Sequence, residues 1–161
     1  MSRFLPVVAV ALVAVSASWA AAPPAKVGIR ATSLGLVLVD AHGRTLYAFD
    51  LDKAGRSACS GACAAAWPPL VTSGKPRAAG IPASKLRTVK RSDGRLQVTF
   101  AGHPLYFFAK DRKAGQVAGA AVAHWAALSP GGVKVHATSA GGAVPPPVTS
   151  TDPGYGGGDG Y

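Results

Sequence analysis

Residues 43–52 (GRTLYAFDLD) and residues 102–111 (GHPLYFFAKD) are two versions of one motif, 59 positions apart. Gly, Leu, Tyr, Phe and Asp recur at equivalent places, and a Lys-Ala-Gly tripeptide follows each copy. Each copy then leads to a tryptophan, Trp67 in the first and Trp125 in the second. Self-similarity at a fixed period indicates an internal repeat, so we interpret the chain as two copies of one unit.

Each unit is predicted to be a three-stranded antiparallel meander. Short β-branched and aromatic runs alternate with turn residues, and Asp93-Gly94 is a strong hairpin signal. The expected strands are 27–32, 36–39 and 45–49 in the first unit and 86–91, 96–100 and 105–109 in the second. One meander can bury only one face, so we expect the two to pack as a small all-β sandwich or partly open barrel. The basic residues on 86–91 suit an edge strand.

The repeated motif is Tyr-x-Phe-x-x-Asp. On a strand, the Tyr and the Phe two residues later point to the same side, and the Asp falls beyond the strand. One interpretation is an aromatic core with a carboxylate that caps the next turn. The other is that the two Tyr/Asp pairs form a ligand or cation site. The residues concerned are Tyr47, Phe49, Asp52, Tyr106, Phe108 and Asp111.

Composition limits the possible chemistry. The chain of 161 residues has 17 Lys and Arg against 7 acids, a formal charge of +10. All the acids are Asp, and Asn is absent, which excludes a glutamate acid/base pair and an Asn-linked glycan. The sequence contains no Gly-x-Ser-x-Gly, His-Glu-x-x-His or phosphate-binding loop motif. We therefore predict no catalytic residues and no cofactor.

The order of segments predicts export. A short basic start, a 12-residue apolar stretch and small residues up to Ala20 predict a signal peptide over 1–20. A leader at 21–26 precedes one β domain at 27–136, in which the repeats occupy 27–70 and 86–132, and residues 140–161 form a Gly/Pro-rich tail predicted to be disordered. We expect a periplasmic or secreted protein with no membrane span in the mature chain.

Cys59 and Cys63 are the only cysteines, and in an exported chain their default state is an intramolecular disulfide. Their spacing fits neither a thioredoxin-type nor a haem-attachment motif. No histidine lies at zinc-ligand spacing from them, so no metal site is predicted. We expect the disulfide to fix a loop against Trp67.

Together these segments resemble a bacterial family of secreted repeats of unknown function, whose members are described as predicted lipoproteins with a Tyr-x-aromatic-x-x-Asp motif. The resemblance rests on the duplicated motif, the Cys59–Cys63 segment and Trp67-Pro68-Pro69-Leu70, and it covers roughly residues 33–132. It implies an exported tandem-repeat protein with no established reaction. The lipid-attachment cysteine that the family description suggests is absent. Residues expected to be structural are Trp67, Pro68, Pro69 and Trp125.

The basic character suggests an anionic partner in the cell envelope, a lipid or a polysaccharide, rather than genomic nucleic acid. A solvated basic surface with no partner is the alternative. We expect a non-enzymatic protein with a binding or structural role; a periplasmic accessory factor for redox or metal handling is the second hypothesis. The candidate polyanion-binding residues are Lys85, Arg87, Lys90, Arg91, Arg95, Lys110, Arg112 and Lys113.

Overall fold

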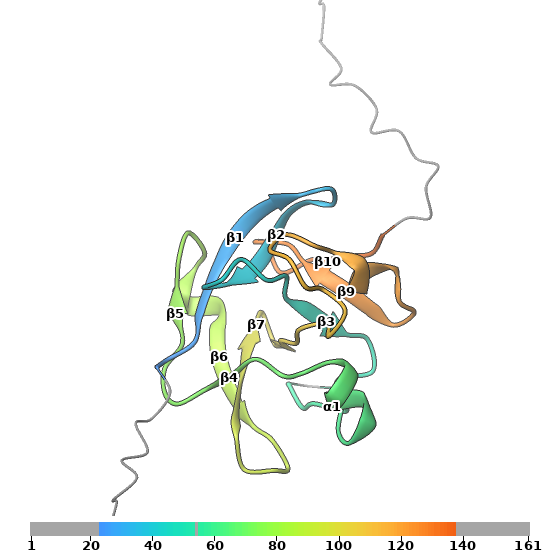
Figure 1. The fold of residues 1–161 in the computed structure, drawn as a ribbon. Coiled ribbons are helices and arrows are strands. Elements are labelled where there is room, and N and C mark those ends of the chain that lie inside the picture. The colour runs from blue at the N-terminus through green and yellow to red at the C-terminus, as the bar shows by residue number, and fades with distance from the viewer. Residues whose placement is uncertain (1–22, 54, 138–161) are drawn as a thin grey trace, which may run out of the picture.

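The computed structural model describes residues 23–53 and 55–137, and this part of the chain consists mainly of short strands (Figure 1). The predicted signal peptide and tail lie outside the described residues. The only α-helix among the described residues is α1 (Ala62–Ala66), and η1 (Ala83–Lys85) and η2 (Ala118–Ala121) are short 3-10 helices. The strands are β1 (Lys26–Thr32), β2 (Gly35–Asp40), β3 (Tyr47–Phe49), β4 (Val71–Thr72), β5 (Arg77–Ala78), β6 (Leu86–Lys90), β7 (Leu96–Phe100), β8 (His103–Pro104), β9 (Trp125–Leu128) and β10 (Lys134–Val135).

The strands form three small sheets, so the all-β prediction is confirmed. Their orders are β2-β1-β5, β10-β9-β3 and β4-β7-β6, and β8 also pairs with β7. Every pairing is antiparallel except that of β1 with β5. None of the sheets closes into a barrel.

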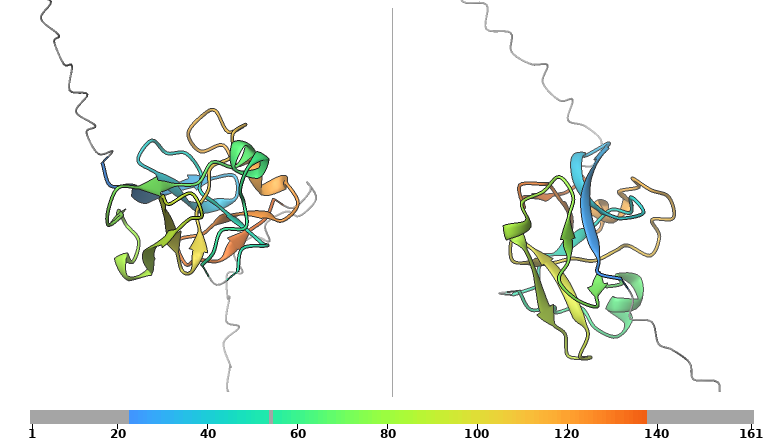
Figure 2. Two further views of the ribbon diagram at one scale, coloured as in Figure 1. Left: turned by 90° about the horizontal axis from the view of Figure 1, so that it is seen from below. Right: turned by 90° about the vertical axis from the view of Figure 1, so that its left-hand side faces the viewer.

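Each repeat begins with a hairpin, β1–β2 in the first and β6–β7 in the second. The Asp93-Gly94 turn joins β6 to β7, and Gly94 has φ +83°, a conformation that glycine adopts without strain. β6 is an edge strand, as its basic residues predict. In Figure 1 and the right-hand view of Figure 2, the β1–β2 hairpin lies at the end of the molecule opposite α1 and the tip of the β6–β7 hairpin.

The predicted strand at 105–109 is wrong in extent. Only Tyr106 pairs there, through isolated bridges to Tyr47 and Pro69. The matching segment of the first repeat forms β3, which pairs over three residues with β9. Pro69 stands opposite Tyr106 and the Pro68 carbonyl accepts the N–H of Phe107, where β9 has alanines. Proline has no N–H with which to extend a ladder, which accounts for the difference.

The repeats are interlocked, whereas the sequence predicted that each repeat pairs its own strands and packs on the other. β3 of the first repeat pairs with β9 at the end of the second. In return, β4 at the end of the first repeat pairs with β7 of the second. Each repeat thus supplies a strand to the other, and neither has its full set of partners alone.

The buried residues form two clusters, and each contains side chains from both repeats. Leu38, Leu46, Val98 and Leu105 belong to the first cluster, and all are fully buried. The second contains the tyrosines and tryptophans of both repeats: Tyr47, Trp67, Tyr106 and Trp125. Both clusters are therefore shared between the two repeats.

Because strands and core are shared, separated repeats should not fold alone. We predict that fragments 23–73 and 75–137, produced separately, lack dispersed amide signals in NMR spectra, since a lone hairpin is marginal in water. Mixed in equal amounts, they should form a folded 1:1 complex. A dispersed spectrum from either fragment alone would contradict the interlocked architecture.

Candidate functional site

The two motif tyrosines meet at the centre of the domain. The N–H of Tyr47 donates to the carbonyl of Tyr106, and the N–H of Tyr106 donates to the carbonyl of Tyr47, both at 2.9 Å. Both side chains are fully buried. This reciprocal pair makes the contact between the repeats nearly symmetric: Leu128 N–H donates to Leu46, and Leu70 N–H donates to Leu105.

The tyrosine of each repeat bonds to the aspartate of the other. The Tyr47 hydroxyl donates to Asp111 Oδ2, and the Tyr106 hydroxyl donates to Asp52 Oδ2 at 2.9 Å. A hydrogen bond to a charged group contributes about 1.5–3 kcal/mol. We call Tyr47–Asp111 and Tyr106–Asp52 the crossed pairs. The sequence shows that each motif contains a Tyr and an Asp, but it gives no sign that their partners are exchanged.

Each carboxylate also caps the loop that follows it, as the turn-cap interpretation predicts. Asp52 Oδ1 accepts the N–H of Ala58 at 2.7 Å, and Asp111 Oδ1 accepts the N–H of Ala118 at 3.2 Å. Each carboxylate therefore both orders a local loop and joins the repeats. These contacts account for the motif without a ligand.

Burial governs the ionisation of these groups. Burial raises the pKa of Tyr106 to about 12, and the neighbouring Asp52 carboxylate acts in the same direction. The pKa of Tyr47 is also raised, by burial first and then by its bond to Asp111. Burial raises the pKa of Asp52 as well, although the Ala58 N–H and the Tyr106 hydroxyl oppose the shift. Both tyrosines are neutral donors at neutral pH.

A stack of four aromatic rings crosses the same centre. Trp67 and Trp125 lie face to face, with centroids 3.7 Å apart and planes 2° from parallel. Phe49 stacks on Trp125 at 4.4 Å, and Phe108 stacks on Trp67 at 4.3 Å. The phenylalanine of each repeat thus packs on the tryptophan of the other. Such pairs contribute about 0.5–1.5 kcal/mol each beyond their buried area.

Arg91 is buried, so the prediction that it lies on an exposed basic surface is wrong. Its Nη1 donates to Ser57 Oγ at 2.8 Å and to Gln97 Oε1 at 2.7 Å. Its Nη2 donates to the carbonyl of Cys59 at 2.8 Å. Ser57 Oγ also lies 2.7 Å from the Tyr106 hydroxyl oxygen, within hydrogen-bond distance, which joins Arg91 to a crossed pair. Sequence reasoning missed Ser57 because its partners Arg91 and Tyr106 lie 34 and 49 positions away in the chain, and it missed Gln97 because an uncharged side chain gives no sign of its partner.

The predicted disulfide is present. Cys59 and Cys63 are bonded, with Cα atoms 5.3 Å apart, and Cys59 is buried against the second core cluster. Trp67 N–H donates to the carbonyl of Cys63 at 2.8 Å, so the loop is fixed beside Trp67 as expected. The Arg91 bond to the carbonyl of Cys59 ties this loop to the β6–β7 hairpin.

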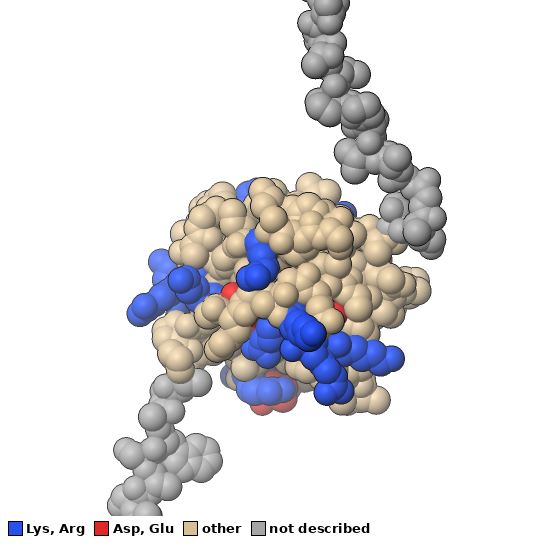
Figure 3. Space-filling model, turned by 45° about the horizontal axis from the view of Figure 1, so that its top comes forward, with Lys and Arg blue, Asp and Glu red and all other residues tan. Residues whose placement is uncertain are grey.

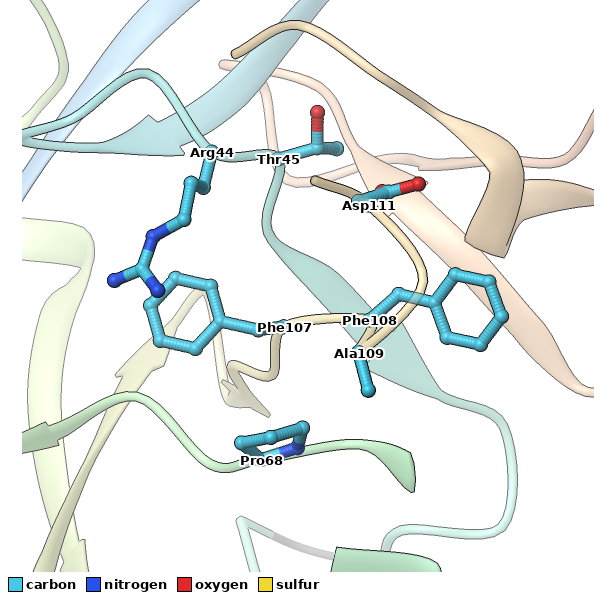
Figure 4. Close-up of a pocket in the computed structure, with 7 residues that line it drawn as sticks. All are labelled: Arg44, Thr45, Pro68, Phe107, Phe108, Ala109 and Asp111. Carbon is cyan, nitrogen blue, oxygen red and sulfur yellow. The ribbon is translucent and has the colours of Figure 1, made fainter. Parts of the chain in front are cut away.

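A small hollow of about 140 Å³ lies beside the first crossed pair (Figure 4). The Arg44 guanidinium covers the Phe107 ring, 4.0 Å from its centroid, while Phe108 points the other way. Arg44 also bonds to Asp40 at 2.7 Å. Burial opposes ionisation of Asp40, but hydrogen bonds from Arg44 and His42 outweigh it and lower the pKa of Asp40. The arginine has two intramolecular partners and is held in place.

The other predicted polyanion-binding residues occur in separate groups along the chain. Lys90 and Arg95 flank the β6–β7 turn, and Arg95 is paired with Asp93 at 2.7 Å. Arg87 is exposed on the edge strand, and Lys85 Nζ donates to the carbonyl of Gly131. The loop after the second motif holds Lys110, Arg112 and Lys113, all exposed. Figure 3 shows Lys and Arg side chains gathered in the lower part and at the left edge of one face, with few acidic atoms among them.

No group of three or more His, Cys or Asp side chains within 23–53 and 55–137 lies close enough to hold a metal ion. No helix of the described residues is long and apolar enough to cross a membrane.

The interlocked fold and duplicated motif define an all-β module built from two repeats. A family model described as a secreted repeat of unknown function matches residues 28–71 and 87–128, more than half of the chain. The chain belongs to this family. The matched segments correspond to the two repeats predicted from the sequence. No curated protein and no solved structure matches the chain.

The raised pKa of Tyr106 predicts weaker folding at alkaline pH. Above pH 10 the unfolded tyrosine loses its proton, whereas the folded one keeps it up to about pH 12. The folded state then binds more protons, so the free energy of unfolding falls as the pH rises from 10 to 12. Tyr106→Phe should reduce the slope of the free energy of unfolding against pH in this range by the equivalent of about one proton. Urea unfolding of both proteins at several pH values measures it, and equal slopes would contradict the assignment.

Proposed function

We propose that this protein is a non-enzymatic binding module that acts outside the cytoplasm and associates with an anionic component of the cell envelope. The observation that carries the proposal is that the described aspartates are bonded to other groups of the protein. Among the described residues, every aspartate has an intramolecular partner. Asp52 and Asp111 bond to tyrosines, and the others pair with bases: Asp40 with Arg44, Asp50 with Lys134, and Asp93 with Arg91 and Arg95.

Most of the basic side chains are therefore not balanced by an acid. Within residues 23–53 and 55–137, the ion pairs with aspartate involve only Arg44, Arg91, Arg95 and Lys134, together with His42. The remaining Lys and Arg are mostly exposed, as Figure 3 illustrates for one face. A surface with one sign of charge attracts polyanions and raises their rate of association.

The motif residues support a binding role over a catalytic one. The crossed pairs place the hydroxyls of the two buried tyrosines in contact with the motif carboxylates, so these groups stabilise the fold. The family description as a secreted repeat supports action outside the cytoplasm. We propose an anionic lipid or polysaccharide of the envelope as the partner.

Association with an anionic surface should depend on ionic strength. We predict that binding to vesicles containing anionic phospholipid weakens by about tenfold or more when NaCl is raised from about 50 to 300 mM, because salt screens exposed charges. Vesicles of phosphatidylcholine alone are the control and should bind weakly at both concentrations. Co-sedimentation measures both. Binding that is insensitive to salt, or equal on the two kinds of vesicle, would overturn the proposal.

A further inference from the structure

A basic hollow lies between the loop that ends at the disulfide and the turn of the β6–β7 hairpin. It has a volume of about 430 Å³, and its walls include Arg56, Lys90, Arg91, Ser60 and Ser92. No acidic side chain is among its lining residues. We propose that this hollow, named the Arg56–Arg91 hollow, binds a phosphate monoester group. The inference rests on the proposed function and deepens it by naming the chemical group that is recognised.

The hollow is formed by both repeats. Arg56 and Ser60 belong to the loop after the first motif, whereas Lys90, Arg91 and Ser92 belong to the hairpin of the second repeat. Arg91 joins the two sides through its bonds to Ser57 Oγ and the carbonyl of Cys59. The disulfide holds the Cys59 side in place. These bonds hold the two sides of the hollow together before a ligand arrives, which reduces the entropy lost on binding.

The charge inside the hollow is positive and only weakly compensated. Arg56 and Lys90 are exposed and make no ion pair with any described residue. Arg91 forms an ion pair with Asp93. Asp93 Oδ2 lies 3.4 Å from Arg91 Nε but 2.7 Å from Arg95 Nη2. Asp93 is therefore held mainly by Arg95. An anion in the hollow would meet three cationic side chains.

Arg91 lines the hollow and brings a further donor to this site. Its side chain is only 4% exposed, and its guanidinium has five N–H groups. Bonds to Ser57, Gln97, Cys59 and Asp93 use four of them, which leaves one N–H on Nη2 without an acceptor among the described residues. A buried guanidinium held by four bonds is a rigid donor, and a charge-assisted bond to a phosphate oxygen is short and strong.

Two hydroxyls complete the donor set. Ser60 and Ser92 are exposed at the hollow, and their hydroxyls bond to no residue in the described part of the chain. Ser57 differs, since its hydroxyl already contacts Tyr106, Arg91 and Cys59. Both free hydroxyls can donate to an anion.

The combination favours a phosphate monoester over a single carboxylate. A monoester carries between −1.5 and −2 charges at about pH 7 and presents three terminal oxygens, which suits three cations and two hydroxyl donors. The hollow is larger than one phosphate group, so the atom that carries the phosphate also fits inside. The group could come from a free phosphorylated small molecule or from the headgroup of a lipid such as phosphatidic acid; the chemistry recognised is the same.

The test is NMR titration of the intact protein at constant ionic strength, first with glycerol 3-phosphate and then with inorganic phosphate, and co-sedimentation with phosphatidic acid vesicles. The double variant Arg56→Gln/Lys90→Gln removes two exposed charges from the hollow and leaves the buried Arg91 network intact. Lys110→Gln/Arg112→Gln is the matched control, because both residues are exposed and outside the hollow. Far-UV circular dichroism verifies that both variants fold.

We expect saturable shifts at Ser60, Arg91 and Ser92, weakened about tenfold by the hollow variant and less than about twofold by the control. Binding of glycerol 3-phosphate with no gain on vesicles identifies a soluble ligand, and tighter binding to vesicles identifies the lipid headgroup; both support the hollow. Shifts that do not saturate, or equal weakening by both variants, overturn it. If the hollow is overturned but salt-dependent binding to vesicles is still observed, the proposed function stands without the hollow. If phosphate binds but no vesicle does, the hollow stands and the envelope surface is removed as the partner.

Discussion

The hydrogen bond from the tyrosine of each repeat to the aspartate of the other constrains the arrangement of the whole domain. It requires the two tyrosines to meet at one point, where their backbones pair reciprocally. That meeting brings Trp67 against Trp125 and exchanges the strands β3 and β4 between repeats. A chain of short strands, several of them only two or three residues long, gains through this exchange a core that neither repeat could close alone.

The same constraint determines which basic side chains have no aspartate partner. Two of the described aspartates are committed to tyrosines, and the remaining three pair with bases close to their own turns or sheets. The carboxylates stabilise the interior and the turns, and the exposed Lys and Arg keep their positive charge. Arg91 belongs to both systems, because it supports Tyr106 through Ser57 and forms the back of the Arg56–Arg91 hollow.

Local patterns in the sequence predicted the local structure. The two hairpins, the Asp93-Gly94 turn, the basic edge strand and the disulfide all follow from short-range signals. The exchange of strands could not be predicted in this way. Tyr47 and Asp111 are 64 positions apart, and because the two repeats have similar sequences, the strands of one repeat could pair with each other or with those of the second repeat. The burial of Arg91 was also hidden, because three of its four acceptors are a serine hydroxyl, a glutamine and a backbone carbonyl, which carry no charge.

The central claim is that each motif is completed by the other repeat, and double-mutant cycles test it directly. The cycles use Tyr→Phe and Asp→Asn variants and compare the free energy of unfolding in urea. The account predicts a coupling energy of about 1–2 kcal/mol for Tyr47 with Asp111 and for Tyr106 with Asp52, and a value near zero for the pairs within one repeat, Tyr47 with Asp52 and Tyr106 with Asp111. Coupling within a repeat and none between repeats would contradict it.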